Sequence, residues 1–224
     1  MSNKCDLVVF DFDGTLANTK PLFSKYCVEH THVEGLGNCN LSELHRAFGA
    51  PDISGLSFGW NCLESEKKSH LLKIYDKTDH AILSDKEVVD LFPFVSETLQ
   101  GLCDKGYEIG IVTSRPSAPT IHILKQHNIY KYIKSIRSFD DVLSKSHRAK
   151  PYPDKLLSLI EELGCEASRT WMIGDTIMDL QMSINAATNT VGVDWGFGEV
   201  EDLLAYEVPI LSENFIGLYN ILNE

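Results

Sequence analysis

Two carboxylates one residue apart, Asp11 and Asp13, follow a short apolar run near the start of the sequence. In an extended chain, alternation points both side chains the same way, so their charges repel. Such a pair is tolerated if a cation lies between the carboxylates or if one of them keeps its proton. Gly14 then allows a tight turn that exposes backbone amides. The pair is a candidate site, and the alternative interpretation is an ordinary acidic loop after a strand.

A second acidic pair, Asp175 and Asp179, follows another apolar run. If a helix begins near Thr176, the two carboxylates lie one turn apart near one helix face. The structural alternative makes Asp175 the helix N-cap and Asp179 a solvated residue. If both acidic pairs follow strands of one parallel sheet, the carboxyl ends of the strands bring them into one crevice. Three or four carboxylates there imply a hard divalent cation with oxygen ligands, and Mg²⁺ fits best.

Groups that could bind an anion lie elsewhere in the chain. Thr113 and Ser114 end a third apolar run, where hydroxyls and amides can hold a phosphate oxygen, although Thr-Ser before Pro is also a common turn. Arg115 could bind an anionic substrate bidentately or pair with surface acids. Lys150 precedes a Pro-x-Pro segment that could hold it toward the crevice, whereas a lone lysine is usually solvated.

The apolar runs before these residues are predicted to be strands. Several are continuous rather than alternating, which is typical of a parallel sheet covered on both faces. Between them lie helical patterns, with Ser96, Ser117 and Ser212 as candidate N-caps and Pro153 in a first turn. Strands that alternate with helices predict a doubly wound, Rossmann-like α/β sheet. The predicted strands are residues 7–10, 107–112, 132–136, 171–173 and 190–193.

The alternation stops between residues 20 and 92. No strand pattern is found there, and helical periodicity recurs, for example at residues 41–48 and 88–91. A structureless crossover of that size would be improbable. We therefore predict an inserted α-helical cap domain, residues 20–92, within a core domain formed by residues 1–19 and 93–224.

The composition limits the classes of partner and the cellular location that we expect for this protein. The 224 residues include 20 Lys and Arg against 32 Asp and Glu, a formal net charge of −12. Such a charge repels nucleic acid and anionic membranes, so neither is expected as a partner, and an anionic substrate needs local cations, a metal or amides. Six scattered cysteines predict reduced thiols. No apolar run reaches the roughly 18 residues that a membrane helix needs, and no signal-peptide pattern is found, so we expect a cytoplasmic protein. His30 and His32 are interpreted as loop residues rather than zinc ligands.

The candidate residues form four motifs in chain order: Asp-x-Asp-Gly-Thr-Leu, Thr-Ser, Lys-Pro and Gly-Asp-Thr-x-x-x-Asp. Over nearly the whole chain they resemble the motifs of the haloacid dehalogenase superfamily of phosphohydrolases. The predicted helical insert is similar to that superfamily's cap, and residues 91–99 and 191–198 resemble its phosphoglycolate phosphatase-like branch. The resemblance implies an enzyme, a Mg²⁺-dependent phosphatase that hydrolyses a small phosphorylated metabolite through an aspartyl-phosphate.

The resemblance also implies roles for the motif residues. Asp11 would be the nucleophile, and Asp13 the general acid and then the base. Thr113 and the Ser114 amide would bind the phosphoryl oxygens, and Lys150 would offset the charge that nucleophile and phosphate share.

The implied metal site uses the two acidic pairs. Mg²⁺ would be held by Asp11, the backbone carbonyl of Asp13, and Asp175. Asp179 would support the metal's waters or Lys150.

Other functions are kept open. Dehalogenases and phosphonatases of the superfamily lack an acid at the position of Asp13, which argues for phosphate esters or anhydrides. A phosphomutase or phosphotransferase uses the same motifs, and cap closure decides between them. A non-catalytic binding protein should have lost a motif residue, and an interaction protein would expose Phe58 and Trp60. The chain is expected to be a monomer or homodimer.

Overall fold

The computed structural model describes residues 6–33, 65–144 and 146–223, and its centre is a six-stranded sheet. The strand order is β3-β2-β1-β4-β5-β6, and every pair of neighbouring strands is parallel. The predicted doubly wound α/β fold is therefore confirmed. The strands are β1 (Leu7–Phe10), β2 (Glu108–Val112), β3 (Ser135–Arg137), β4 (Thr170–Gly174), β5 (Asn189–Val193) and β6 (Ile210–Leu211).

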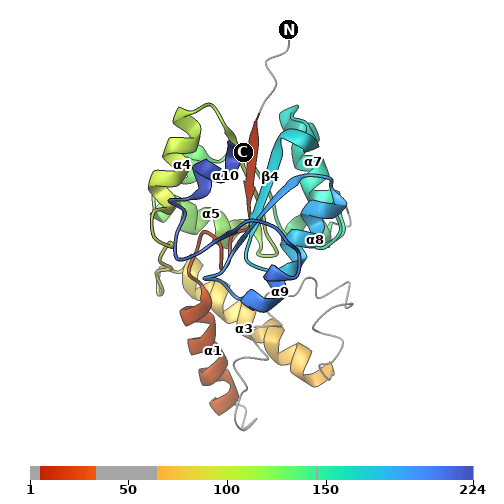
Figure 1. The fold of residues 1–224 in the computed structure, drawn as a ribbon. Coiled ribbons are helices and arrows are strands. Elements are labelled where there is room, and N and C mark those ends of the chain that lie inside the picture. Colours follow the sequence, from red (N-terminus) through yellow and green to blue (C-terminus); the bar gives the residue numbers. More distant parts are fainter. Residues whose placement is uncertain (1–5, 34–64, 145, 224) are drawn as a thin grey trace.

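Both faces of the sheet are covered by helices, which explains why the strands read as continuous apolar runs. In β1, Val8 and Phe10 point into one core cluster, and Leu7 and Val9 point into a second. The first cluster includes residues of α4, α5 and α10, and the second includes residues of α7 and α8. Figure 1 shows these two groups of helices on opposite sides of β1 and β4.

The helices of the described residues flank the strands in sequence. They are α1 (Lys20–Val33), α3 (Ser65–Leu83), α4 (Val95–Asp104), α5 (Ser117–Gln126), α6 (Phe139–Leu143), α7 (Asp154–Leu163), α8 (Ile177–Asn185), α9 (Val200–Leu204) and α10 (Leu218–Leu222), with short 3₁₀ turns at Tyr130–Tyr132 and Ala167–Arg169.

Helix ends follow the sequence signals only in part. The expected Pro153 start is confirmed, since Pro153 directly precedes α7. The three serine caps are wrong. Ser96 lies inside α4, Ser117 is the first residue of α5 after the cap residue Pro116, and Ser212 lies upstream of α10. At Ser117 a tertiary contact is made instead of a cap, because the Ser117 backbone N–H donates to Asp140 Oδ2 at 3.0 Å.

Two strand predictions needed correction. The third strand begins at Ser135 rather than at residue 132, because Tyr130–Tyr132 form a 3₁₀ turn. The two-residue strand β6, which pairs with β5, was not predicted, since two residues carry no readable period.

Helices α1 and α3 lie between β1 and β2 in sequence and pack against each other, with the rings of Phe23 and Tyr75 5.5 Å apart. Figure 1 shows both helices beyond the carboxyl ends of the strands. The predicted helical pattern at residues 88–91 is wrong, because that segment is irregular and Leu91 bridges to Ala17. Residues 41–48, Phe58 and Trp60 lie outside the described residues.

Two expectations about single residues, and one about membrane helices, can be compared with the structure. His30 is buried in α1 rather than in a loop, and His32 also belongs to that helix. Cys27 and Cys103 are free thiols, but Cys165 is disulfide-bonded, so the expectation of uniformly reduced cysteines is wrong. In the described part of the chain, no helix combines the length and apolar character that a membrane crossing requires.

Candidate active site

The site lies where the chain reverses its direction of travel across the sheet. From β1 the chain moves outward to β2 and β3, then returns to β4 on the other side of β1. Crevices form at such switch points, at the carboxyl ends of the strands. Asp11 follows the last residue of β1 and Asp175 the last residue of β4, and these strands are neighbours in register, Phe10 opposite Ile173.

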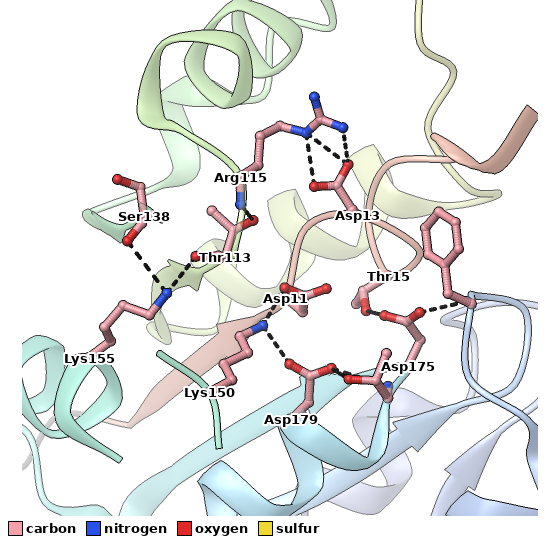
Figure 2. A network of polar contacts seen from close by, with 12 residues as sticks. Asp11, Asp13, Thr15, Thr113, Arg115, Ser138, Lys150, Lys155, Asp175 and Asp179 are labelled. Carbon is pink, nitrogen blue, oxygen red and sulfur yellow. Dashed lines mark hydrogen bonds and ion pairs between the residues drawn. The ribbon is translucent and has the colours of Figure 1, made fainter. Parts of the chain in front are cut away.

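Lys150 joins two of the acidic residues. Its Nζ donates to Asp11 Oδ1 and to Asp179 Oδ1, each at 2.5 Å, and Figure 2 shows it between the two carboxylates. The lysine is only 4% exposed and Asp179 only 1%. The alternatives of a solvated Lys150 and a solvated Asp179 are therefore wrong.

Asp175 is held from two directions. Thr15 Oγ1 donates to Asp175 Oδ1 at 2.8 Å, and the Phe197 N–H donates to Oδ2 at 2.7 Å. Space at this carboxylate is short, because a Cβ on Gly14, whose φ is +83°, would lie 2.3 Å from Oδ2. The sequence between β1 and α1 therefore needs glycine at this position.

Helix α8 is capped by Thr176 rather than by Asp175. Asp179 completes a capping box, because its Oδ2 accepts from the Thr176 N–H at 3.1 Å and from the Thr176 hydroxyl at 2.6 Å. The cap therefore fixes one Asp179 oxygen and leaves the other to Lys150.

The electrostatics of this cluster favour an additional cation. Burial, opposed by Lys150 and reinforced by Asp179 and Asp175, raises the pKa of Asp11 well above its usual range. Burial and repulsion from Asp179 raise the pKa of Asp175 to about 7. Burial lowers the pKa of Lys150, but its attraction to Asp11 and Asp179 outweighs this and holds the pKa above its ordinary value. One lysine thus faces three buried carboxylates.

The same three carboxylates could hold a metal ion. One oxygen each from Asp11, Asp175 and Asp179 lies within 4.8 Å of the others. Buried carboxylate oxygens in excess over cations are a donor set that suits Mg²⁺. The Asp13 side chain is not part of this group of three, although it lines the same cavity as Asp11 and Asp179.

Asp13 is instead paired with Arg115. The Arg115 Nε donates to both carboxylate oxygens of Asp13 at 2.9 Å, and Nη2 lies 2.9 Å from Oδ1. Nη1 of the same guanidinium contacts Asp79 on α3. Arg115 is 3% exposed, so the expectation that it pairs with surface acids is wrong. Figure 2 shows its guanidinium beside the Asp13 carboxylate.

The remaining predicted residues line one small cavity. Thr113 is buried, and its hydroxyl accepts a 3.0 Å hydrogen bond from the Arg115 N–H. The cavity measures about 30 Å³ and is lined by Asp11, Asp13, Tyr75, Thr113, Ser114, Arg115, Lys150, Thr176, Asp179 and Phe197. Since one water needs about 10–15 Å³ by this measure, the cavity has room for a group of a few atoms.

Sequence reasoning missed Tyr75 and Asp79, which α3 brings to the site. They are one helical turn apart and so share a face. Burial, opposed by Arg115, raises the pKa of Asp79 to about 6. Nothing in the sequence distinguishes this aspartate from the other acids of α3.

A buried lysine was also missed. Lys155 Nζ donates to the carbonyl of Thr113 at 2.7 Å and to that of Ser138 at 3.4 Å, so it lies behind the Thr113 segment (Figure 2). Burial, with repulsion from Lys150, lowers the pKa of Lys155 to about 7. Lys155 is the second residue of α7, and nothing in the sequence separates it from a surface lysine.

Comparisons with known proteins agree with this fold. Pyrophosphatase PpaX of Oceanobacillus iheyensis is 27% identical over 218 residues, which cover 97% of this chain and 96% of that protein. PpaX of Bacillus mycoides is 29% identical and covers 98% of each chain. Among solved structures, a predicted phosphoglycolate phosphatase from Haemophilus somnus superposes with a TM-score of 0.79 at 20% identity and covers 99% of each chain. A haloacid dehalogenase-like family hydrolase from Streptococcus pneumoniae gives 0.76 at 20% identity, over 97% of this chain and 98% of that one.

The family model for haloacid dehalogenase-like hydrolases matches residues 8–193, which include every motif residue discussed above. This chain therefore belongs to the haloacid dehalogenase-like hydrolase family.

Proposed function

We propose that this hydrolase is a Mg²⁺-dependent phosphatase that acts on a small phosphorylated metabolite through an aspartyl-phosphate. The observation that carries the proposal is the cluster of Asp11, Asp175 and Asp179 around Lys150 at the carboxyl ends of β1 and β4. A phosphoryl group is anionic, so a site for it must offset charge on a protein of net charge −12.

In the proposed mechanism Asp11 attacks phosphorus. Its Oδ1 is held by Lys150 at 2.5 Å, which fixes the carboxylate and lowers the repulsion between it and the incoming phosphate. The bond from phosphorus to the leaving oxygen breaks, and Asp13 protonates that oxygen. Asp13 then takes a proton from the water that hydrolyses the phosphorylated Asp11.

The metal would be held by Asp11, Asp175 and the backbone carbonyl of Asp13. When bound, Mg²⁺ neutralises charge on the phosphoryl group and on its ligands. Asp179 is better placed to support Lys150, because its two oxygens are already bonded to Lys150 and to Thr176. Thr15 and the Phe197 N–H orient Asp175 for this role.

The phosphoryl oxygens would be bound by Thr113 and the Ser114 amide, which line the cavity opposite Lys150. We further propose that residues 20–92 form a cap over a core of residues 1–19 and 93–224. Helix α3 supports this division, because its Tyr75 lines the cavity at the strand ends and its Asp79 contacts Arg115.

The substrate is proposed to be small. With α3 in its present place, the cavity of about 30 Å³ accommodates a phosphoryl group but not a whole metabolite. One similar protein is named a pyrophosphatase and another a predicted phosphoglycolate phosphatase, so pyrophosphate and phosphoglycolate are the first candidates.

The test is phosphate release from a panel of phosphorylated metabolites that includes pyrophosphate and phosphoglycolate, with Mg²⁺ or with chelator. We expect release that needs Mg²⁺ and that is lost in Asp11→Asn. Asp76→Asn is the matched control, because it removes a carboxylate from an exposed position on α3.

Two results would contradict the proposal. Release that persists in Asp11→Asn would exclude this residue as nucleophile. Absence of release from every compound, with the protein folded and Mg²⁺ present, would favour a phosphomutase or a non-catalytic binding role, and transfer from a sugar bisphosphate to a sugar phosphate would separate the two.

A further inference from the structure

The reaction proposed above assigns no role to Arg115. This residue follows the phosphate-binding pair Thr113-Ser114, but its guanidinium does not open into solvent toward an incoming substrate. It is 3% exposed and its donors are directed at two carboxylates, Asp13 and Asp79. The two come from different parts of the chain, because Asp13 follows β1 and Asp79 lies on α3.

The contact with Asp13 fixes both oxygens of that carboxylate. Nε lies 2.9 Å from each oxygen, and Nη2 lies 2.9 Å from Oδ1. A planar guanidinium that engages both oxygens sets the plane of the carboxylate, which a single point charge cannot do.

Through the contact between Arg115 and Asp79, the orientation of the Asp13 carboxylate depends on the position of α3. The Asp79 side chain is 15% exposed and that of Asp13 is 13% exposed, so the three charged groups form a largely buried chain from β1 to α3. Tyr75, one turn before Asp79, lines the cavity beside them. Without α3 in place, Arg115 would lose one of its two carboxylate partners and part of its cover from water.

We propose that Arg115 is a positioning residue that holds Asp13 as the oriented base for hydrolysis of the phosphorylated enzyme, and that Asp79 makes this orientation depend on the seating of α3. This inference rests on the proposed function. In the step concerned, water gives a proton to Asp13 while its oxygen bonds to phosphorus. The bond between phosphorus and the Asp11 oxygen breaks, phosphate leaves, and Asp11 is a carboxylate again.

The step can be isolated with p-nitrophenyl phosphate, whose leaving group needs no protonation. In rapid-mixing experiments with Mg²⁺, the first turnover reports phosphoryl transfer to Asp11, and the steady rate reports hydrolysis of the phosphorylated enzyme. We expect Arg115→Met to lower the steady rate by about 100-fold, the lower range for loss of a general base. The first turnover should slow far less, so a burst of p-nitrophenolate close to one per enzyme appears.

The same variant should accumulate phosphorylated protein, which intact mass spectrometry of acid-quenched samples detects as the addition of one phosphoryl group. A merely structural role would lower the burst and the steady rate together and would leave no phosphorylated protein. Arg115→Lys should fall between wild type and Arg115→Met, because it keeps the charge but not the two-oxygen contact.

Asp79→Asn tests the part played by α3 and leaves the Asp13 contact intact if Arg115→Met fails to fold. We expect the steady rate to fall about tenfold with a visible burst, as for loss of one charge-assisted hydrogen bond. Asp76→Asn on the same helix and Arg148→Met on the surface are controls and should match the wild type.

The outcomes separate this inference from the function on which it rests. A wild type that releases phosphate, together with Arg115 and Asp79 variants that lose burst and steady rate in equal measure, overturns the inference alone. Variants with wild-type kinetics overturn it as well. A wild type that releases no phosphate from any ester overturns the proposed function, and this inference with it.

Discussion

The site has two ion-pair groups that are built differently. In the Lys150 group, one lysine faces Asp11 and Asp179, with Asp175 beside them, and every member comes from the sheet domain's strand ends or adjoining segments. In the Arg115 group, one arginine faces Asp13 and Asp79, and Asp79 comes from α3. The first group surrounds its cation with buried carboxylates, whereas the second lies between the sheet and α3.

The difference shows how one crevice can both favour a metal ion and orient the Asp13 carboxylate. The Lys150 group encloses more negative than positive charge, so the pKa values of Asp11 and Asp175 are raised and a further cation is favoured. In the Arg115 group, the guanidinium Nε donates to both oxygens of Asp13, and Nη1 links the pair to Asp79 of α3. Charge for a metal is therefore supplied by residues that follow the strands, and orientation of Asp13 by a contact between separate segments.

The largest expected effect comes from removing the cation of the first group. Lys150→Met leaves three carboxylates buried without their lysine, which should lower the free energy of unfolding by about 3–5 kcal/mol. Arg115→Met should cost less, because its two partners are more exposed. Urea unfolding of both variants measures the comparison, with exposed Lys73→Met as control. Equal losses would contradict the distinction between the two groups.

Mg²⁺ should stabilise the folded protein only by binding to the carboxylates of the Lys150 group. At Mg²⁺ about 100-fold above its Kd, binding adds about 2.7 kcal/mol, which raises Tm by about 5–10 °C for a chain of this length. The shift should be absent in Asp175→Asn and preserved in Asp79→Asn. Differential scanning fluorimetry with Mg²⁺ and with chelator measures it. A shift that survives in Asp175→Asn would remove that residue from the metal site.

The crowding around Asp175 should make Gly14 sensitive to substitution. Gly14→Ala combines a φ of +83° with a Cβ 2.3 Å from Asp175 Oδ2, and we expect a loss of about 1–3 kcal/mol. Gly106→Ala is the matched control, since Gly106 has a φ of +87° but nothing within 4 Å of the added Cβ. Denaturant unfolding should show the larger loss for Gly14→Ala. A loss no greater than that of Gly106→Ala would mean that Asp175 moves without cost.

A pH dependence of stability is expected from Lys155, which lies behind the Thr113 segment. Its pKa is lowered from 10.5 to about 7 in the folded protein, so between these values the unfolded chain binds more protons. The stability that Lys155 contributes should therefore rise from pH 7 toward pH 10.5. The difference in unfolding free energy between wild type and Lys155→Met should grow over that range. A difference that stays constant over that range would show that Lys155 titrates normally.

Much of the fold was predictable because the strands that carry the site are buried on both faces. Continuous apolar runs at residues 7–10 and 171–173 coincide with β1 and with the centre of β4, and the acidic pairs follow them directly. The serine caps failed because a cap competes with tertiary partners, as Asp140 does at Ser117. The cytoplasmic location and the monomer or homodimer state remain predictions.

The acids after the strands, the Thr-Ser pair and the lysine before proline could all be found from the sequence, because each is recognised within one strand and the loop that follows it. What each of these residues contacts depends on the tertiary fold. It turned Asp13 away from the acidic cluster toward Arg115, and it brought Asp79 from a helix 66 residues further along the chain to the same guanidinium. The physical reason is that the burial and the ion pairing of a side chain depend on which segments pack together. The sequence of α3 does not indicate which of its acidic residues contacts a cation.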